Sequence, residues 1–343
     1  MAQTTIDTES LNEEFYQVSP DILDSFPKFR LPLNLYHFKE DIAQLTPFYY
    51  AENRLTKDQQ KDMTRLSREG SLFVSRSDHK IYAKHISKQL DLILVDKNLT
   101  RDEITYIIKY ALTDKISKFY DQPVAAVLEK LKSDIWVLTE YLWTERTRIN
   151  HLLDLLHDEY SHTHLSYNSG IIGLAIFMEA QGESLKRKTL DQLALGLFTH
   201  MLGLTRVPKF ILEKKTNLSR DEQAKLTNYP MNGAAIMRKL DVMEDVVLNC
   251  HLEHREMIDG SGLPRGLKGT EITLHGRITA VCHTFCELTM TRDGKALSCD
   301  KALEYMMSAS QKYDPKITRR LNSVILNLIG RQRLEQSRQK TGA

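Results

Sequence analysis

Short stretches rich in apolar and aromatic residues, bounded by polar ones, mark the first third of the chain and predict short strands. They are Leu31 to Phe38, Leu45 to Tyr50 and Ser71 to Ser75. Between the second and third stretches, residues 56–68 follow a helical period. Thr56 can cap the start of this helix and Gly70 stands just beyond its end.

The same patterning divides the beginning of the chain into a leader and a small domain. Residues 1–25 are polar without a steady period, which predicts a mobile leader. Two further helices, over 78–95 and 100–119, complete the small domain. We therefore predict an α+β domain over residues 26–120.

A seam of apolar residues in alternating steps of three and four follows between residues 123 and 157. Its members are Leu128, Leu131, Ile135, Leu138, Leu142, Ile149, Leu152 and Leu156. Glu145 occupies the one missed position. Such a seam is typical of a coiled coil, because it keeps one narrow stripe facing a partner. We predict a long connecting helix over 121–157. Its partner is either a second copy, in a parallel homodimer through 124–157, or a neighbouring domain of the same chain.

The remainder of the chain has helical periodicity throughout. Ser219 and Glu222 form a capping box at the start of one helix, and Pro230 is expected to interrupt the helical pattern there. The predicted segments are 168–181, 189–202, 219–226, 242–256, 274–291 and 299–311. The sequence thus predicts a mainly α protein, with an all-helical bundle over 158–333 and a solvated basic tail over 334–343.

Composition limits the classes of function. Hydrophobic residues make up 41% of the 343 residues, charged residues make up 27%, and the net charge is +2. These values are typical of a soluble globular protein. The net charge is too small to produce an electrostatic field that would favour nucleic acid or a membrane as partner. No apolar run approaches about 18 residues and no signal-peptide core is present, so we expect a cytoplasmic protein.

The four cysteines do not predict a metal site. They are Cys250, Cys282, Cys286 and Cys299. Cys282 and Cys286 have helical spacing but lack a second pair for zinc, so we expect ordinary thiols.

One glycine-rich loop with its flanking motifs carries the strongest functional signal. The loop is Asp259-Gly-Ser-Gly-Leu-Pro, preceded by His254-Arg255-Glu256. Its flanking motifs are His200-Met-Leu-Gly-Leu, Leu218-Ser-Arg-Asp-Glu-Gln, Tyr229-Pro230, Arg277-Ile-Thr-Ala-Val, Leu288-Thr289 and Tyr313-Asp314-Pro315. In this order and spacing, over about 155–330, they resemble the HD-GYP family of cyclic di-GMP phosphodiesterases.

This resemblance implies a helical bundle in which His and Asp side chains hold two or three metal ions, commonly iron or manganese. The metal centre would split cyclic di-GMP to pGpG or GMP. The signature loop would comprise Asp259, Gly260, Gly262, Leu263 and Pro264, with Leu263 in place of the family's tyrosine. In the family this loop also docks GGDEF-domain proteins.

Most of the implied metal-ligand positions are substituted. Histidine stands at three of them: His200, His254 and His283. Other residue types stand at the remaining positions: Ser166, Met201, Tyr229, Arg255 and Cys286. Leu204 replaces a phosphate-binding lysine. A thioether does not replace a bridging carboxylate, and a guanidinium repels a metal ion.

Two hypotheses follow. The first is a bacterial signalling or interaction protein without catalytic activity and without a metal cofactor. It would sense cyclic di-GMP through Arg292, Lys295 and Arg255, or dock a partner such as a GGDEF-domain protein. The second is an atypical cyclic di-GMP phosphodiesterase or phosphohydrolase with a single zinc, iron or manganese ion at His200, His254 and His283. Neither involves a nucleic-acid or membrane partner.

Overall fold

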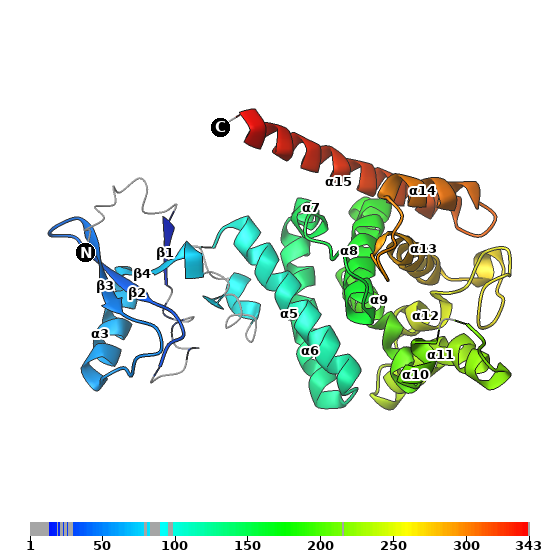
Figure 1. Ribbon diagram of the computed structural model, residues 1–343, viewed down its shortest axis with the longest axis horizontal. Coiled ribbons are helices and arrows are strands. Elements are labelled where there is room, and N and C mark those ends of the chain that lie inside the picture. The colour runs from blue at the N-terminus through cyan, green and yellow to red at the C-terminus, as the bar shows by residue number, and fades with distance from the viewer. Residues whose placement is uncertain are drawn as a thin grey trace. The chain divides into compact units, whose positions relative to one another are not determined.

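The structure, a computed structural model, describes residues 14–18, 20, 23, 26, 30–78, 81–82, 90–94, 99–214 and 216–341. The chain divides into two compact units, residues 1–111 and 112–343. The first contains the only sheet among the described residues, and the second is helical (Figure 1).

The N-terminal unit has a four-stranded antiparallel sheet of order β1-β4-β2-β3. The strands are β1 (Phe15–Gln17), β2 (Leu35–Lys39), β3 (Gln44–Tyr49) and β4 (Leu72–Ser75). Helix α3 (Lys57–Arg68) begins with the predicted capping box at Thr56, and Gly70 beyond its end has φ +73°. The three predicted strands and this helix are confirmed.

Two predictions for this unit need correction or fall outside the described residues. Strand β1 lies inside the predicted mobile leader, where Tyr16 is 2% exposed and pairs with Val74. Residues 1–13 are outside the described part of the chain. Of the predicted helix over 78–95, only residues 78, 81–82 and 90–94 are described. Residues 81–82 are helical, whereas Arg76–Asp78 and Leu90–Leu94 are short 3₁₀ turns.

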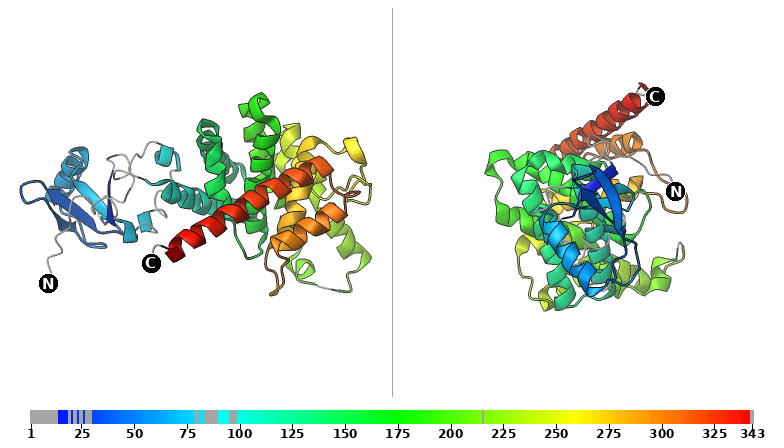
Figure 2. Two further views of the ribbon diagram at one scale, coloured as in Figure 1. Left: turned by 90° about the horizontal axis from the view of Figure 1, so that it is seen from above. Right: turned by 90° about the vertical axis from the view of Figure 1, so that its left-hand side faces the viewer.

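Helices α5 to α15 follow, and all but the start of α5 lie in the C-terminal unit (Figures 1 and 2). They are α5 (Arg101–Asp121), α6 (Ala125–Thr144), α7 (Ile149–Leu153), α8 (His162–Gln181), α9 (Arg187–Thr199), α10 (Lys209–Leu212), α11 (Arg220–Lys239), α12 (Asp245–Glu253), α13 (Leu274–Thr289), α14 (Cys299–Ser308) and α15 (Pro315–Thr341). The predicted helical bundle is confirmed. Residues 334–341 of the predicted basic tail continue α15, which is helical to Thr341.

The predicted long helix over 121–157 is interrupted. Helix α6 ends at Thr144, because Glu145 is extended (φ −149°, ψ 103°), and a 3₁₀ turn at Arg146–Arg148 leads into α7. The break falls where the apolar seam misses a position. Within α6 the seam is at most 1% exposed and packs inside the chain: Leu128, Leu131, Ile135, Leu138 and Leu142. This is the intramolecular packing that the sequence left open.

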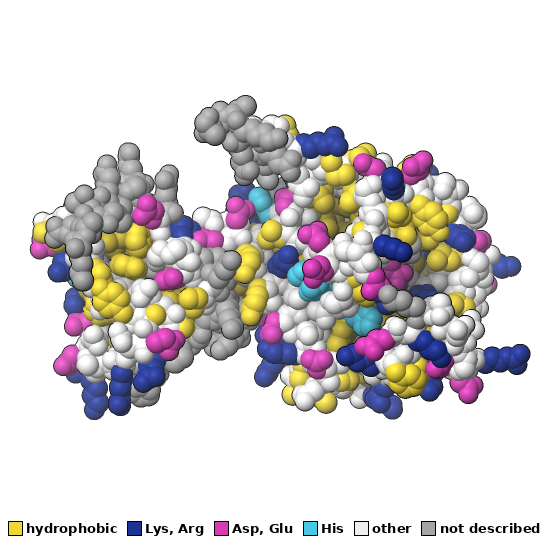
Figure 3. All heavy atoms as spheres, in the orientation of Figure 1, with side chains coloured by type: hydrophobic (Ala, Val, Ile, Leu, Met, Phe, Trp, Pro, Cys, Tyr) yellow, Lys and Arg dark blue, Asp and Glu magenta, His cyan; other side chains and the backbone are white. Residues whose placement is uncertain are grey.

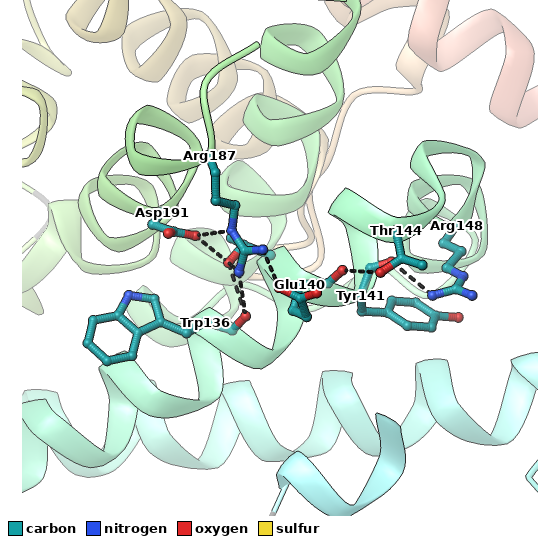
Figure 4. Close-up of polar contacts among 8 residues, drawn as sticks. Trp136, Glu140, Tyr141, Thr144, Arg148, Arg187 and Asp191 are labelled. Atoms are coloured by element: carbon teal, nitrogen blue, oxygen red, sulfur yellow. Dashed lines mark hydrogen bonds and ion pairs between the residues drawn. The ribbon is translucent and has the colours of Figure 1, made fainter. Parts of the chain in front are cut away.

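Polar contacts fasten α6 to α9 through one arginine (Figure 4). The guanidinium of Arg187 donates to Asp191 at 2.9 Å, to Thr139 at 3.2 Å and to the carbonyl of Trp136 at 3.3 Å, and it also pairs with Glu140. One side chain thus fixes the two helices against each other.

Pro230 does not interrupt its helix as predicted, because α11 continues from Arg220 to Lys239. Proline has no N–H to offer the carbonyl four residues earlier, which belongs to Leu226. Arg255 donates to that carbonyl from Nη1 at 2.7 Å. A donor from outside the helix therefore replaces the missing backbone hydrogen bond.

No helix among the described residues combines the length and the apolar character needed to cross a membrane.

Candidate functional site

Two glycines bring the chain segments of the site together. Gly203, in the 3₁₀ segment His200–Arg206, lies so close to α11 that an added Cβ would be 1.8 Å from the carbonyl oxygen of Tyr229. An added Cβ on Gly233 would be 2.8 Å from Nδ1 of His251. Only glycine permits this approach, which places His200 next to α11 and α12.

Three buried histidines from different segments converge where the 3₁₀ segment packs against α11 and α12. They are His200 at the start of the 3₁₀ segment, His254 at the end of α12 and His283 on α13, and none is more than 3% exposed. Their ring centroids are 5.0 to 5.2 Å apart. The structure thus brings together the three histidines singled out in the sequence.

Hydrogen bonds assign the protons of two of these rings. Nδ1 of His200 lies 2.7 Å from the carbonyl oxygen of Leu197, and Nδ1 of His254 lies 2.7 Å from that of His251. A carbonyl oxygen only accepts, so each Nδ1 must donate, and Nε2 of the neutral ring must accept.

Both of these Nε2 atoms already have donors. Nε2 of His200 accepts from Nδ1 of His283 at 3.1 Å, and Nε2 of His254 accepts from the hydroxyl of Tyr229 at 2.7 Å. A metal ion would need the same lone pairs. Internal protons therefore occupy the positions that a metal would take.

Burial keeps these imidazoles neutral. It lowers the pKa of His200 to about 4, despite the opposing effect of the hydrogen bond to the carbonyl of Leu197. It also lowers the pKa values of His254 and His283 well below the ordinary value, with further lowering from His200 and Arg255. At neutral pH the cluster consists of uncharged rings joined by hydrogen bonds.

A cationic rim lies beside the cluster. The guanidinium of Arg255 stacks over the ring of Tyr229 at 5.3 Å, and that of Arg292 stacks over Tyr160 at 4.6 Å. Arg292 and Lys295 are the ends of a two-residue hairpin whose backbone hydrogen bonds are both 3.0 Å. Figure 3 shows histidine at the surface of this unit close to acidic and basic side chains.

The family model described as "HD domain" matches residues 151–317. The chain is 30% identical over 163 residues to the cyclic di-GMP phosphodiesterase PA4108 of Pseudomonas aeruginosa, covering 47% of this chain and 38% of that protein. It is 33% identical over 140 residues to the cyclic di-GMP phosphodiesterase response regulator RpfG of Xanthomonas campestris pv. campestris, covering 40% of this chain and 35% of that protein. Residues 151–317 are therefore an HD domain, similar to the HD domains of these relatives.

One solved structure has the same fold along most of the chain. It is Bd1817, an HDG"Y"P protein from Bdellovibrio bacteriovorus, with a TM-score of 0.60, 13% identity, and coverage of 91% of this chain and 99% of that chain. The chain spans only 38% and 35% of the two curated relatives named above.

The side chains of this HD domain do not fit a binuclear metal centre. Met201 offers a buried thioether, 3.8 Å from the hydroxyl of Tyr229. Ser166 shares a 2.6 Å hydrogen bond with Tyr120. Among the described residues, no three His, Cys, Asp or Glu side chains are arranged to hold a metal ion. A bridging carboxylate is missing from the described cluster.

Two buried glutamates accept hydrogen bonds from the signature loop and its flanking residues. Glu256 belongs to a motif singled out in the sequence but was given no role there, and Glu253 was not singled out. Glu256 accepts the backbone N–H groups of Arg265 and Leu267 at 2.8 and 3.0 Å. Glu253 accepts from the backbone and hydroxyl of Thr273 at 2.9 and 2.7 Å and pairs with Arg265 at 2.9 Å. The sequence did contain a signal for this role, since two acidic residues precede a glycine-rich loop. The backbone N–H groups of such a loop need acceptors, and carboxylates nearby in the chain can supply them.

The loop itself is compact, with one apolar residue at its surface. Asp259 accepts from the backbone and hydroxyl of Ser261 at 2.8 and 2.6 Å. Gly260 has φ +85°, and an added Cβ on Gly262 would be 2.1 Å from a backbone nitrogen. Leu263, which precedes Pro264, is 37% exposed.

Proposed function

We propose that this chain is a signalling or interaction protein of the HD-GYP family that does not carry out metal-dependent hydrolysis. The observation that carries the proposal is the internal use of both acceptor nitrogens: Nε2 of His200 is occupied by His283, and Nε2 of His254 by Tyr229. A lone pair that accepts a proton donor cannot bind a metal at the same time.

We further propose a cyclic dinucleotide as the signal. The relatives are named for cyclic di-GMP, and Arg255, Arg292 and Lys295 offer positive charge for a phosphate diester. Such signalling would take place in the bacterial cytoplasm. Leu263 in the signature loop provides a contact for a protein partner such as a GGDEF-domain protein.

A second candidate is a phosphodiesterase with a single metal ion at His200, His254 and His283. The names of the relatives favour this candidate over the first, and the convergence of three imidazoles is consistent with it. It requires His283 to turn away from His200, and Tyr229 to release His254.

Metal analysis and a turnover assay on the purified full chain separate the two candidates. We expect less than about 0.1 metal ion per chain and no pGpG or GMP from cyclic di-GMP with added Mn²⁺ or Fe²⁺ under anaerobic conditions. Metal content near one ion per chain, with turnover that His254→Ala abolishes, would establish the second candidate and refute the first.

A designed variant provides the positive control. Met201→Asp, Tyr229→His and Arg255→His together restore a carboxylate and two imidazoles and remove the guanidinium. Metal bound by this variant and not by the wild-type chain would show that these three side chains exclude it.

A further inference from the structure

A cavity of about 350 Å³ lies in the C-terminal unit, where the break between α6 and α7, the end of α8 and the middle of α15 meet. Its volume falls within the range of roughly 300–1,000 Å³ that is usual for small-molecule sites. None of the residues that line it belongs to the histidine cluster or to the cationic rim. The cavity is therefore a separate place at which a ligand can bind.

The buried part of the cavity wall is aliphatic. It consists of Ile149, Leu153, Ala175, Met178 and Val324, and none of these residues is more than 8% exposed. Among the described residues that line the cavity, none is aromatic. Such a wall favours a ligand with an aliphatic body, because its carbons leave water when they cover this surface.

Two opposite charges stand at one end of the cavity, where α8 ends. Nη1 of Arg146 donates to the carbonyl of Gly182, the C-cap residue of α8, at 2.7 Å. Glu179 lies three residues before Gly182, on the last turn of the same helix, and it lines the same cavity. Residues three apart on a helix are neighbours on its surface. The fold thus brings a guanidinium and a carboxylate to the same end of an apolar cavity.

These polar groups keep hydrogen-bonding capacity for a ligand. No ion pair joins Arg146 to Glu179 among the described residues, and Arg146 uses only one of its five N–H groups on Gly182. Asn150 adds a fixed amide to the cavity wall. Its Oδ1 accepts from Arg331 of α15 at 3.1 Å, which leaves its NH₂ group to donate.

We propose that this cavity binds a free α-amino acid with an aliphatic side chain, such as leucine. The ligand's carboxylate binds Arg146 and the amide of Asn150, its ammonium group binds Glu179, and its side chain covers the aliphatic wall. An α-amino acid carries both charges on one carbon, which matches two opposite charges at one end of the cavity. A fatty acid or an alkylamine leaves one of these charges without a partner. The site does not depend on the proposed function.

Methyl NMR of the full chain with ¹³C-labelled methionine tests this proposal, because Met178 lines the cavity. L-Leucine should shift the methyl signal of Met178, which Met178→Leu identifies, with a dissociation constant of about 1 mM or tighter. 4-Methylpentanoate lacks the ammonium group and 3-methylbutylamine lacks the carboxylate. Each should bind at least about tenfold more weakly, because one charge-assisted interaction is lost.

Three variants locate the ligand. Glu179→Gln should weaken leucine binding by about tenfold, because the ammonium group loses its counter-charge at an exposed position that does not hold the fold together. The control Glu183→Gln removes the same charge at an exposed position outside the cavity wall and should leave the affinity within about twofold. Ala175→Leu fills the cavity and should abolish binding, with circular dichroism confirming that it is folded.

The results decide the proposal without any measurement of turnover. A Met178 shift that leucine produces at lower concentration than either analogue, and that Glu179→Gln weakens, supports it. No shift at about 10 mM leucine, equal binding of leucine and 4-methylpentanoate, or equal affinities in Glu179→Gln and the wild type would overturn it. Leucine binding that persists in a folded Ala175→Leu variant would place the ligand elsewhere and would also overturn it.

Discussion

Acidification should destabilise the C-terminal unit through its buried imidazoles. Burial lowers the pKa of His200 to about 4 and that of His251 to about 3. In an unfolded chain a histidine titrates near about 6.5. Between these values the unfolded chain binds more protons than the folded one, so falling pH favours unfolding.

The expected magnitude follows from these pKa values. With a folded pKa of about 4 and an unfolded pKa of about 6.5, one histidine lowers the free energy of unfolding by about 2 kcal/mol between pH 7 and pH 5. His251 adds about the same amount. Together they remove about 4 kcal/mol, a large share of the roughly 5–15 kcal/mol typical of a domain. His254 and His283 act in the same direction.

Tryptophan fluorescence during urea unfolding measures this loss in the C-terminal unit alone. The chain has two tryptophans, Trp136 and Trp143, and both lie on α6. The free energy of unfolding should fall steeply from pH 6.5 to pH 5 and stay nearly constant from pH 7.5 to pH 8.5. A fall of less than about 1 kcal/mol between pH 7 and pH 5, or buried imidazole NMR signals that titrate near pH 6.5, would refute the assignment of neutral rings.

Two substitutions test the packing of the site by urea unfolding. Tyr229→Phe should lower the free energy of unfolding by about 1–3 kcal/mol, because the buried Nε2 of His254 loses its hydrogen-bond donor. The control Tyr305→Phe, at a position 46% exposed, should change it by less than about 0.5 kcal/mol. Equal effects of the two substitutions would contradict the hydrogen bond between Tyr229 and His254. Gly203→Ala should lower the free energy of unfolding by about 3 kcal/mol or more, because the new Cβ would be 1.8 Å from a carbonyl oxygen. The control Gly330→Ala on α15 meets nothing within 4 Å and should raise it by about 0.5–1 kcal/mol. If Gly203→Ala is tolerated, the packing of the 3₁₀ segment against α11 is looser than described.

Local signals in the sequence were sufficient for much of the fold. The capping boxes at Thr56 and Ser219 depend on residues three positions apart, so the sequence alone identifies the starts of α3 and α11. The short strand β1 was missed because Phe15–Gln17 is too brief to show a period and depends on pairing with β4.

The site depended on contacts between distant residues. Motif resemblance identified His200, His254 and His283, but their hydrogen bonds are set by the fold. Tyr120 meets Ser166 across 46 positions and came from a segment assigned to the other domain.

Arg255 links the fold of this HD domain to the chemistry of its site. Pro230 leaves the carbonyl of Leu226 without its helical N–H donor. The long side chain of Arg255 brings its guanidinium group to that carbonyl, and the same group stacks on Tyr229. The same positive charge lowers the pKa values of His254 and His283 and disfavours a cation beside them. One side chain therefore completes the hydrogen bonding of α11, favours neutral imidazoles and opposes metal binding. The residue that argues most strongly against a metal centre is also part of the framework, so it cannot be exchanged without affecting α11.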